Sequence, residues 1–228
     1  MMSNVLEGLS ETVKWHLMVQ AAKRGLEASG YQSEREPGRG LSNVWTITKN
    51  GKSEKASIRT TRDRWIAFPP LDGGKKWKTL DEVDVVVVAT VDDRDDPKSV
   101  EVYKFPAADV RGRFDAAFAA RTTAGQTVRI NFGMWVGLDQ DIRKIPRSVG
   151  SGIVDQYKPI AVYPIAELLT EAGAIDPASL GEPDGDAIAQ DDPQAPDNEP
   201  PLTIPEAKRR LALTFGCDPE NIKIIVEA

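Results

Sequence analysis

The sequence predicts an α/β protein in which a helix, a mixed β-sheet and a second helix follow one another. Three observations point to this class. Apolar residues recur at helical spacing between Ser10 and Ser29. A strong turn signal, Asn50-Gly51, separates two strand-like stretches. The run VDVVVVATV is uniformly apolar, which is typical of a strand buried on both faces.

The first helix is expected over residues 10–29 and meets a stop signal at Gly30. The stretch YQSEREPGRG after it is expected to be a loop. Strands are predicted over 44–48 and 56–61, on either side of the Asn50-Gly51 turn. RWIAF then continues as a third strand or as an extension of the second.

The buried strand VDVVVVATV has SVEVYKF as its expected neighbour, across the acidic loop DDRDDPK. Val110, Phe114, Ala117 and Phe118 predict a second helix that ends near Arg121. Later segments are less regular. TVRINFGMWVGL is compatible with a strand, SVGSG with turns and PIAELLTEAG with a short helix.

Composition indicates a soluble globular protein, with 40% hydrophobic and 28% charged residues among 228. No stretch approaches the roughly 18 apolar residues of a membrane span. The first residues lack the basic and apolar regions of a secretory signal. Cys217 is the single cysteine, which excludes an intramolecular disulfide and a cysteine-built zinc site. We therefore expect a cytoplasmic protein without membrane contact.

The net charge of −6 is unevenly distributed. Residues 171–200 contain nine acidic and no basic side chains, whereas residues 1–170 contain 25 Lys and Arg against 22 Asp and Glu. This predicts an α/β domain at 1–170, a flexible acidic Pro/Asp/Ala-rich linker at 171–201 and a C-terminal helix-strand unit at 202–228. The last unit is too short to fold alone, so we expect it to dock on its own body, on a second copy or on a partner protein.

One long region carries a resemblance to a known family. It comprises VWTITKNGKSEKASIRTTRDRWIAF, then WKTLDEVDVVVVATVDD and VEVYKFP. Over residues 10–120 the chain resembles the PD-(D/E)xK nuclease superfamily, especially its intron-associated and Holliday-junction-type endonucleases. Arg59-Thr60 stands where these proteins have a Lys-Thr pair. The resemblance implies a restriction-endonuclease-like core, DNA or RNA as a partner, and a role in a bacterial mobile element or in defence.

The family's catalytic pattern is not retained in this sequence. Such nucleases hold a divalent cation with an acid on one strand and with a carboxylate two residues before a lysine on the next. Alternate strand residues share a face, so the second pair corresponds to Ser57 and Arg59. Serine is a poor magnesium ligand without carboxylates, and arginine does not release a proton near neutral pH. The first hairpin strand, which contains Thr46, has no Asp or Glu between residues 37 and 53.

A relocated metal site is the alternative within the same family. Its candidate ligands are Glu11, Glu54 and Asp84, and its cofactor would be Mg²⁺ or Mn²⁺. Without such a site no metal or other cofactor is expected.

Residues 49–64 contain six cations against two acids, and further lysines follow near Trp65 and Trp77. Such a surface can contact phosphates and stack bases, or it can be a solvated hairpin whose lysines discourage edge pairing. The candidate nucleic-acid contacts are Lys49, Lys52, Lys55, Arg59, Arg62, Arg64, Lys75 and Lys76.

Three hypotheses of function remain open from the sequence. The first is a catalytically inactive nuclease-like protein that binds nucleic acid, a protein partner, or both. The second is an active metal-dependent endonuclease that uses the relocated acids. The third is an adaptor that recruits a partner, or a second copy, through residues 202–228.

Overall fold

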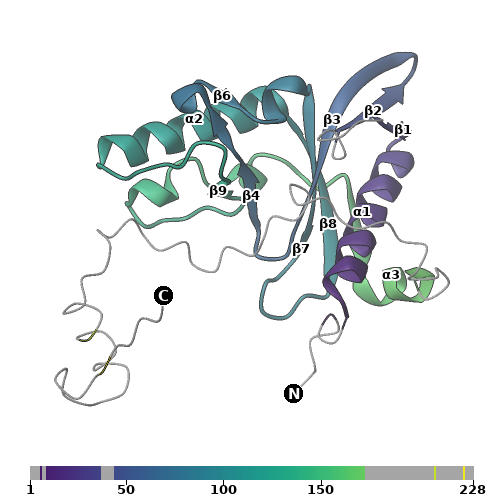
Figure 1. Ribbon diagram of the computed structural model, residues 1–228. Coiled ribbons are helices and arrows are strands. Elements are labelled where there is room, and N and C mark those ends of the chain that lie inside the picture. Colours follow the sequence, from purple (N-terminus) through teal and green to yellow (C-terminus); the bar gives the residue numbers. More distant parts are fainter. Residues whose placement is uncertain (1–5, 7–8, 37–43, 173–207, 209–222, 224–228) are drawn as a thin grey trace. The chain divides into compact units, whose positions relative to one another are not determined.

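The computed structural model describes residues 6, 9–36, 44–172, 208 and 223 (Figure 1). The chain divides into two compact units, Met1–Asp191 and Asp192–Ala228. The helices and strands with described bounds all belong to the first unit. Nearly all of the predicted acidic linker and of the C-terminal unit lies outside the described residues.

The first unit is an α/β structure built on a six-stranded mixed sheet. In spatial order the strands are β1 (Gln32–Arg35), β2 (Val44–Lys49), β3 (Lys52–Thr61), β7 (Val85–Val91), β8 (Ser99–Pro106) and β10 (Ala161–Pro164). β3 and β7 run parallel, and every other neighbouring pair is antiparallel. The α/β class and the mixed sheet predicted from the sequence are therefore confirmed.

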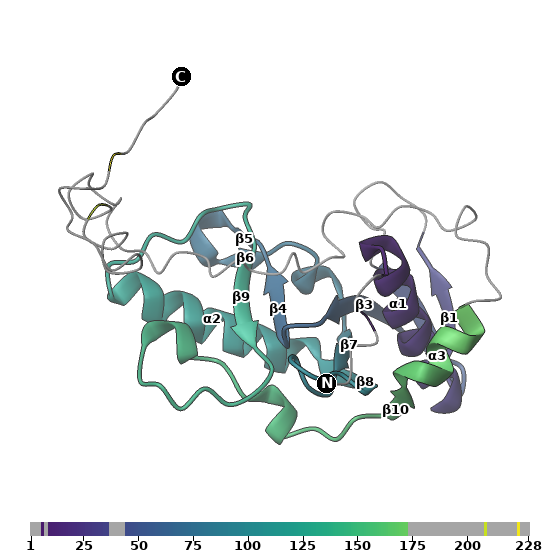
Figure 2. The same cartoon turned by 90° about the horizontal axis from the view of Figure 1, so that it is seen from below.

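Helices and a small ribbon cover the two faces of this sheet (Figures 1 and 2). One face packs against α1 (Glu11–Ala28) and α3 (Ile165–Ala172). The other packs against α2 (Ala107–Thr123) and a ribbon of β4 (Trp65–Phe68) and β9 (Met134–Gly137). A short hairpin, β5 (Pro70–Leu71) and β6 (Lys76–Trp77), adjoins α2. The apolar side chains accordingly form two cores, one on each face.

α1 confirms the first predicted helix and shows why it fits the sheet. Ser10 caps its N-terminus, because the Ser10 Oγ accepts a hydrogen bond from the Val13 N–H at 3.3 Å. Gly25 is buried where the helix meets β8, and a Cβ at this position would lie 3.0 Å from Val102 Cγ1. Glycine therefore lets the helix backbone approach the sheet closely.

The hairpin and the buried strand are also confirmed. Asn50 and Gly51 have φ angles of 52° and 75°, and a type I′ turn between two strands needs positive φ at both positions. β7 lies between β3 and β8 with all seven of its residues buried, as its uniform apolar sequence predicts. β8 and α2 occupy the segments predicted for them.

One expectation about the remaining segments is wrong, because Gln32–Arg35, expected in a loop, pairs with β2 as the edge strand β1. Of the two alternatives for RWIAF, the structure confirms a separate third strand, β4. The chain turns at Arg64, where φ is 63°, and β4 pairs with β9 outside the main sheet. Within TVRINFGMWVGL only Met134–Gly137 is a strand, and the sequence pattern gives no sign of β10. Each of these strands is fixed by a partner outside its own segment, which local periodicity does not reveal.

Candidate functional site

Ser57 and Arg59 correspond to the catalytic positions of the family that the sequence resembles, and the structure places both inside the core. The alternation of β3 is as predicted: Ala56 and Ile58 pack on the α1 side, whereas Arg59 points to the side of α2 and β4. The Arg59 guanidinium lies over the Phe68 ring at 4.4 Å. Ser57 is 0% exposed and Arg59 is 4% exposed. A phosphate in solution therefore has no access to this face of β3.

The surroundings of Ser57 and Thr46 differ. The Ser57 Oγ is buried and has no hydrogen-bond partner among the described residues, which makes it a costly position for a polar atom. Thr46 is half-buried on β2 and donates a hydrogen bond from its Oγ1 to Glu36 Oε1 at 2.5 Å. Its opposite neighbour across the hairpin is Lys55, two residues before Ser57. The hydrogen bond to Glu36 joins β2 to the residue that follows β1, and the pairing with Lys55 belongs to the β2–β3 hairpin.

Each of the three relocated-acid candidates already has a hydrogen-bond or ion-pair partner in the structure. Asp84 Oδ2 accepts a hydrogen bond from the Lys55 backbone N–H at 2.8 Å. Glu54 Oε2 bonds Lys104 Nζ at 2.9 Å. Asp84 thereby joins the chain before β7 to β3, and Glu54 links β3 to β8 across the sheet.

Glu11 lies far from the other two acids. Its carboxylate pairs with Arg62 at 2.8 Å, just after β3, whereas Asp84 is bonded to Lys55 near the other end of the strand. Seven residues of extended chain separate Lys55 from Arg62, a distance of about 23 Å at roughly 3.3 Å per residue. Within the described part of the chain, no group of three or more His, Cys, Asp or Glu side chains could hold a metal ion. The structure does not bring the three acids together.

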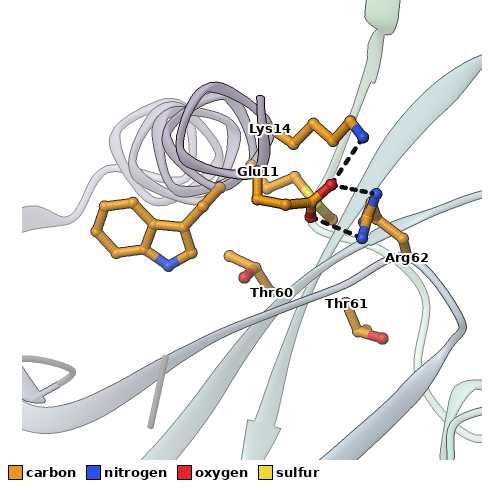
Figure 3. A pocket seen from close by; sticks show the side chains of 7 residues that line it. Glu11, Lys14, Thr60, Thr61 and Arg62 are labelled. Atoms are coloured by element: carbon orange, nitrogen blue, oxygen red, sulfur yellow. Dashed lines mark hydrogen bonds and ion pairs between the residues drawn. The ribbon is translucent and has the colours of Figure 1, made fainter. Parts of the chain in front are cut away.

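Glu11 instead forms one wall of a shallow pocket between the start of α1 and the end of β3 (Figure 3). The pocket encloses about 320 Å³, including space open to solvent. Its lining residues are Glu11, Lys14, Trp15, Met18, Thr60, Thr61 and Arg62. The Glu11 carboxylate bonds both Lys14 and Arg62 at 2.8 Å. An anion from solution would therefore have to displace Glu11 to reach these cations.

The charge state of Glu11 follows from these contacts. The hydrogen bond from Lys14 holds the pKa of Glu11 below its ordinary value, with help from the charges of Arg62 and Lys14, although burial acts in the opposite direction. Glu11 is thus ionised at neutral pH, and its carboxylate neutralises part of the positive charge in this pocket.

Arg64 belongs to a buried polar network at the end of the main sheet. Its side chain is 12% exposed and bonds Glu101 at 3.0 Å and Asp139 at 2.7 Å. Burial alone would lower the pKa of Arg64, but the hydrogen bonds to Asp139 and Glu101 raise it above its ordinary value. Burial, together with a hydrogen bond to Glu101, raises the pKa of Tyr103 to about 12.

The eight candidate nucleic-acid contacts do not form one surface. Lys49, Lys52 and Lys55 are exposed at the hairpin end of β3, and Lys49 Nζ donates to the Ser29 carbonyl at 2.7 Å. Arg62 and Arg64 follow the opposite end of β3, about 33 Å from Lys52 for ten extended residues, and Arg59 is buried between the two ends. Lys75 and Lys76 lie on the exposed β5–β6 hairpin, where Lys76 pairs with Asp72 at 3.3 Å.

The outward side of the β4–β9 ribbon is a surface that the sequence prediction missed. Trp65 and Trp135 lie there, next to Arg129, Phe132 and Arg147. The cluster FGMW holds Phe132 close to Trp135 in sequence, but only the pairing of β4 with β9 adds Trp65.

Comparison of the chain with protein-family models, with curated proteins and with solved structures finds no match. In the part of the chain that the structure describes, no helix combines the length and the apolar character needed to cross a membrane. The case for a function therefore rests on the geometry of the molecule.

Proposed function

We propose that this protein is a non-catalytic α/β protein of PD-(D/E)xK-like organisation that binds nucleic acid. The order of elements supports the family assignment: α1, the β2–β3 hairpin, β7, β8 and α2 follow one another as the resemblance implies.

The burial of Ser57 and Arg59 carries the proposal. Metal-dependent hydrolysis needs carboxylates that hold the cation where the scissile phosphate can reach it. Here the corresponding face of β3 holds a serine at 0% exposure and an arginine at 4%. Phe68 of β4 lies against that arginine and closes the face from outside. In this proposal β3, which corresponds to the catalytic strand of the family, is a packed interior strand.

Nucleic acid as the partner is supported by charge. Residues 1–170 carry three more cations than acids. Lys52 and Lys55 are exposed on β3, Lys75 is exposed next to β6, and Arg129 is exposed beside the β4–β9 ribbon. Exposed lysine and arginine side chains bind phosphates by electrostatic attraction, which weakens steeply as the salt concentration rises.

A combined binding and cleavage assay tests this proposal. The full-length protein is incubated with labelled single-stranded, duplex and branched DNA and with RNA, each in EDTA, Mg²⁺ or Mn²⁺. We expect retarded complexes in all three conditions, weaker as salt rises, with no shortened product. Metal-dependent cleavage by the wild-type protein that is lost in E11Q/D84N would establish the relocated nuclease. Unaltered mobility of every nucleic acid at low salt would refute binding.

A further inference from the structure

The outward face of the β4–β9 ribbon is built differently from its inward face. Ile66, Phe68, Met134 and Val136 point inward and are at most 3% exposed. The alternate positions point outward, where Trp65 lies opposite Gly137 and Trp135 lies opposite Ala67. Both tryptophans are only half-buried. Figure 2 shows the two strands of the ribbon side by side. Because Trp65 and Trp135 alternate with the inward residues, the two indole rings lie on the side away from the core.

Small residues beside the two tryptophans hold the rings against the backbone. A Cβ on Gly133 would lie 3.0 Å from the Trp135 ring, so this ring occupies the space that a side chain at 133 would need. A Cβ on Gly137 would lie 3.6 Å from the Trp65 ring. The two rings therefore lie close to the backbone of the ribbon.

A third aromatic residue and two arginines extend this surface. The Phe132 ring is 50% exposed and lies 5.6 Å from the Trp135 ring at an angle of 63°. The Arg129 guanidinium lies 5.8 Å from the centre of the Phe132 ring, and the Arg147 guanidinium lies 5.0 Å from that of Trp65. We call these five residues, Trp65, Arg129, Phe132, Trp135 and Arg147, the aromatic ribbon face.

The segment that carries most of this face has more basic than acidic residues. Residues 121–150 contain five Lys or Arg side chains and two acids. Both acids are already paired, Asp139 with Arg64 and Asp141 with Arg143. An anionic ligand thus meets arginines at this face without an opposing free carboxylate from the same segment.

We propose that the aromatic ribbon face binds single-stranded nucleic acid, with bases stacked on Phe132 and the indole rings and with phosphates bound by Arg129 and Arg147. This inference rests on the proposed function and names the surface that performs it. Stacking requires bases whose faces are open, which a single strand offers and a duplex does not. Arg129 beside Phe132 and Arg147 beside Trp65 can each interact with a phosphate and with a stacked base.

The test uses the full-length protein and a fluorescein-labelled dT20 oligonucleotide in a polarisation titration. The variant R129A/F132A removes two exposed side chains from the face, and R94A/V162A removes one exposed arginine and one exposed apolar side chain elsewhere. Stacking and phosphate contacts of usual strength predict that R129A/F132A weakens binding about 10-fold or more. The control variant is expected to stay within about 2-fold of wild type.

A second measurement does not depend on any variant. Unlabelled dT20 is expected to quench the tryptophan emission of the wild-type protein, with the same Kd as in the polarisation titration. Equal affinity for dT20 and for a 20-base-pair duplex would overturn the stacking inference. If R129A/F132A bound dT20 as tightly as wild type, the ribbon would be refuted and the proposed function would stand. If the wild-type protein bound no nucleic acid at all, both proposals would fail.

Discussion

Replacement of Arg64 by alanine is expected to destabilise the protein, although the sequence placed Arg64 among the nucleic-acid contacts. The side chain is 12% exposed. Its guanidinium bonds Glu101 at 3.0 Å, Asp139 at 2.7 and 2.9 Å, and the Val91 carbonyl. Arg64 therefore joins the start of β4 to β7, to β8 and to the chain after β9.

The magnitude follows from the groups that would lose a partner. Glu101 is 22% exposed, so the loss of Arg64 as its ion-pair partner is expected to lower the free energy of unfolding by about 2 kcal/mol. Asp139 is 54% exposed, so water replaces Arg64 there at a cost of about 0.5 kcal/mol. With the Val91 carbonyl included, R64A is expected to lower the free energy of unfolding by about 3 kcal/mol. This corresponds to a fall in Tm of roughly 6–12 °C for a domain of this size.

Urea unfolding followed by circular dichroism measures this effect, with R62A as the matched control. Arg62 pairs with Glu11 at 28% and 58% exposure, so R62A is expected to cost less than about 1 kcal/mol. R64K is expected to fall between wild type and R64A, because lysine keeps the charge but cannot form the two-pronged bond to Asp139. If R64A were at least as stable as R62A, the stabilising role of Arg64 would be disproved, because solvent would then already screen its ion pairs.

Three further outcomes are expected. Placing an acid and a lysine on this face of β3, as in S57D/R59K, should lower the free energy of unfolding by more than about 3 kcal/mol, because it puts a carboxylate where the chain is 0% exposed. Plasmid nicking with Mg²⁺ should stay at the wild-type level, and metal-dependent nicking would contradict the non-catalytic proposal. Burial raises the pKa of Asp92, but hydrogen bonds from the backbone N–H groups of its loop outweigh burial and hold that pKa below its ordinary 3.8. Its stabilisation is therefore present above about pH 3.8 and is lost as pH falls through the lower folded-state pKa. In urea titrations D92N should cost about 1–2 kcal/mol at pH 7, and its difference from wild type should shrink as the pH falls below about 3.8. In the same assay G25V should lower the free energy of unfolding by about 1–3 kcal/mol, because the valine side chain would overpack against Val102. G112V is the control, because a Cβ at that position meets nothing within 4 Å, and it should cause no such loss. Equal losses in the two variants would contradict the close approach of α1 to β8.

The elements that depend on local interactions could be predicted from the sequence alone. The helix at 11–28, the Asn50-Gly51 turn and the buried strand at 85–91 each follow from residues within the element, through periodicity, turn chemistry or uniform apolar character. The placement of Ser57 and Arg59 on one face of β3 was equally predictable, because the two-residue repeat of a strand needs no partner. The lack of Asp and Glu between residues 37 and 53 could also be read directly from the chain.

Which of these faces is exposed to solvent depends on the tertiary structure and could not be predicted. Arg59 looked like a surface cation in the sequence, and it is buried because Phe68 of β4 packs over it. Glu11 and Asp84 both looked available as ligands, yet they lie at opposite ends of β3. The outward tryptophans became one surface through the pairing of β4 with β9. Burial and proximity of this kind depend on which distant segments pack together, and no property of a short segment encodes that choice.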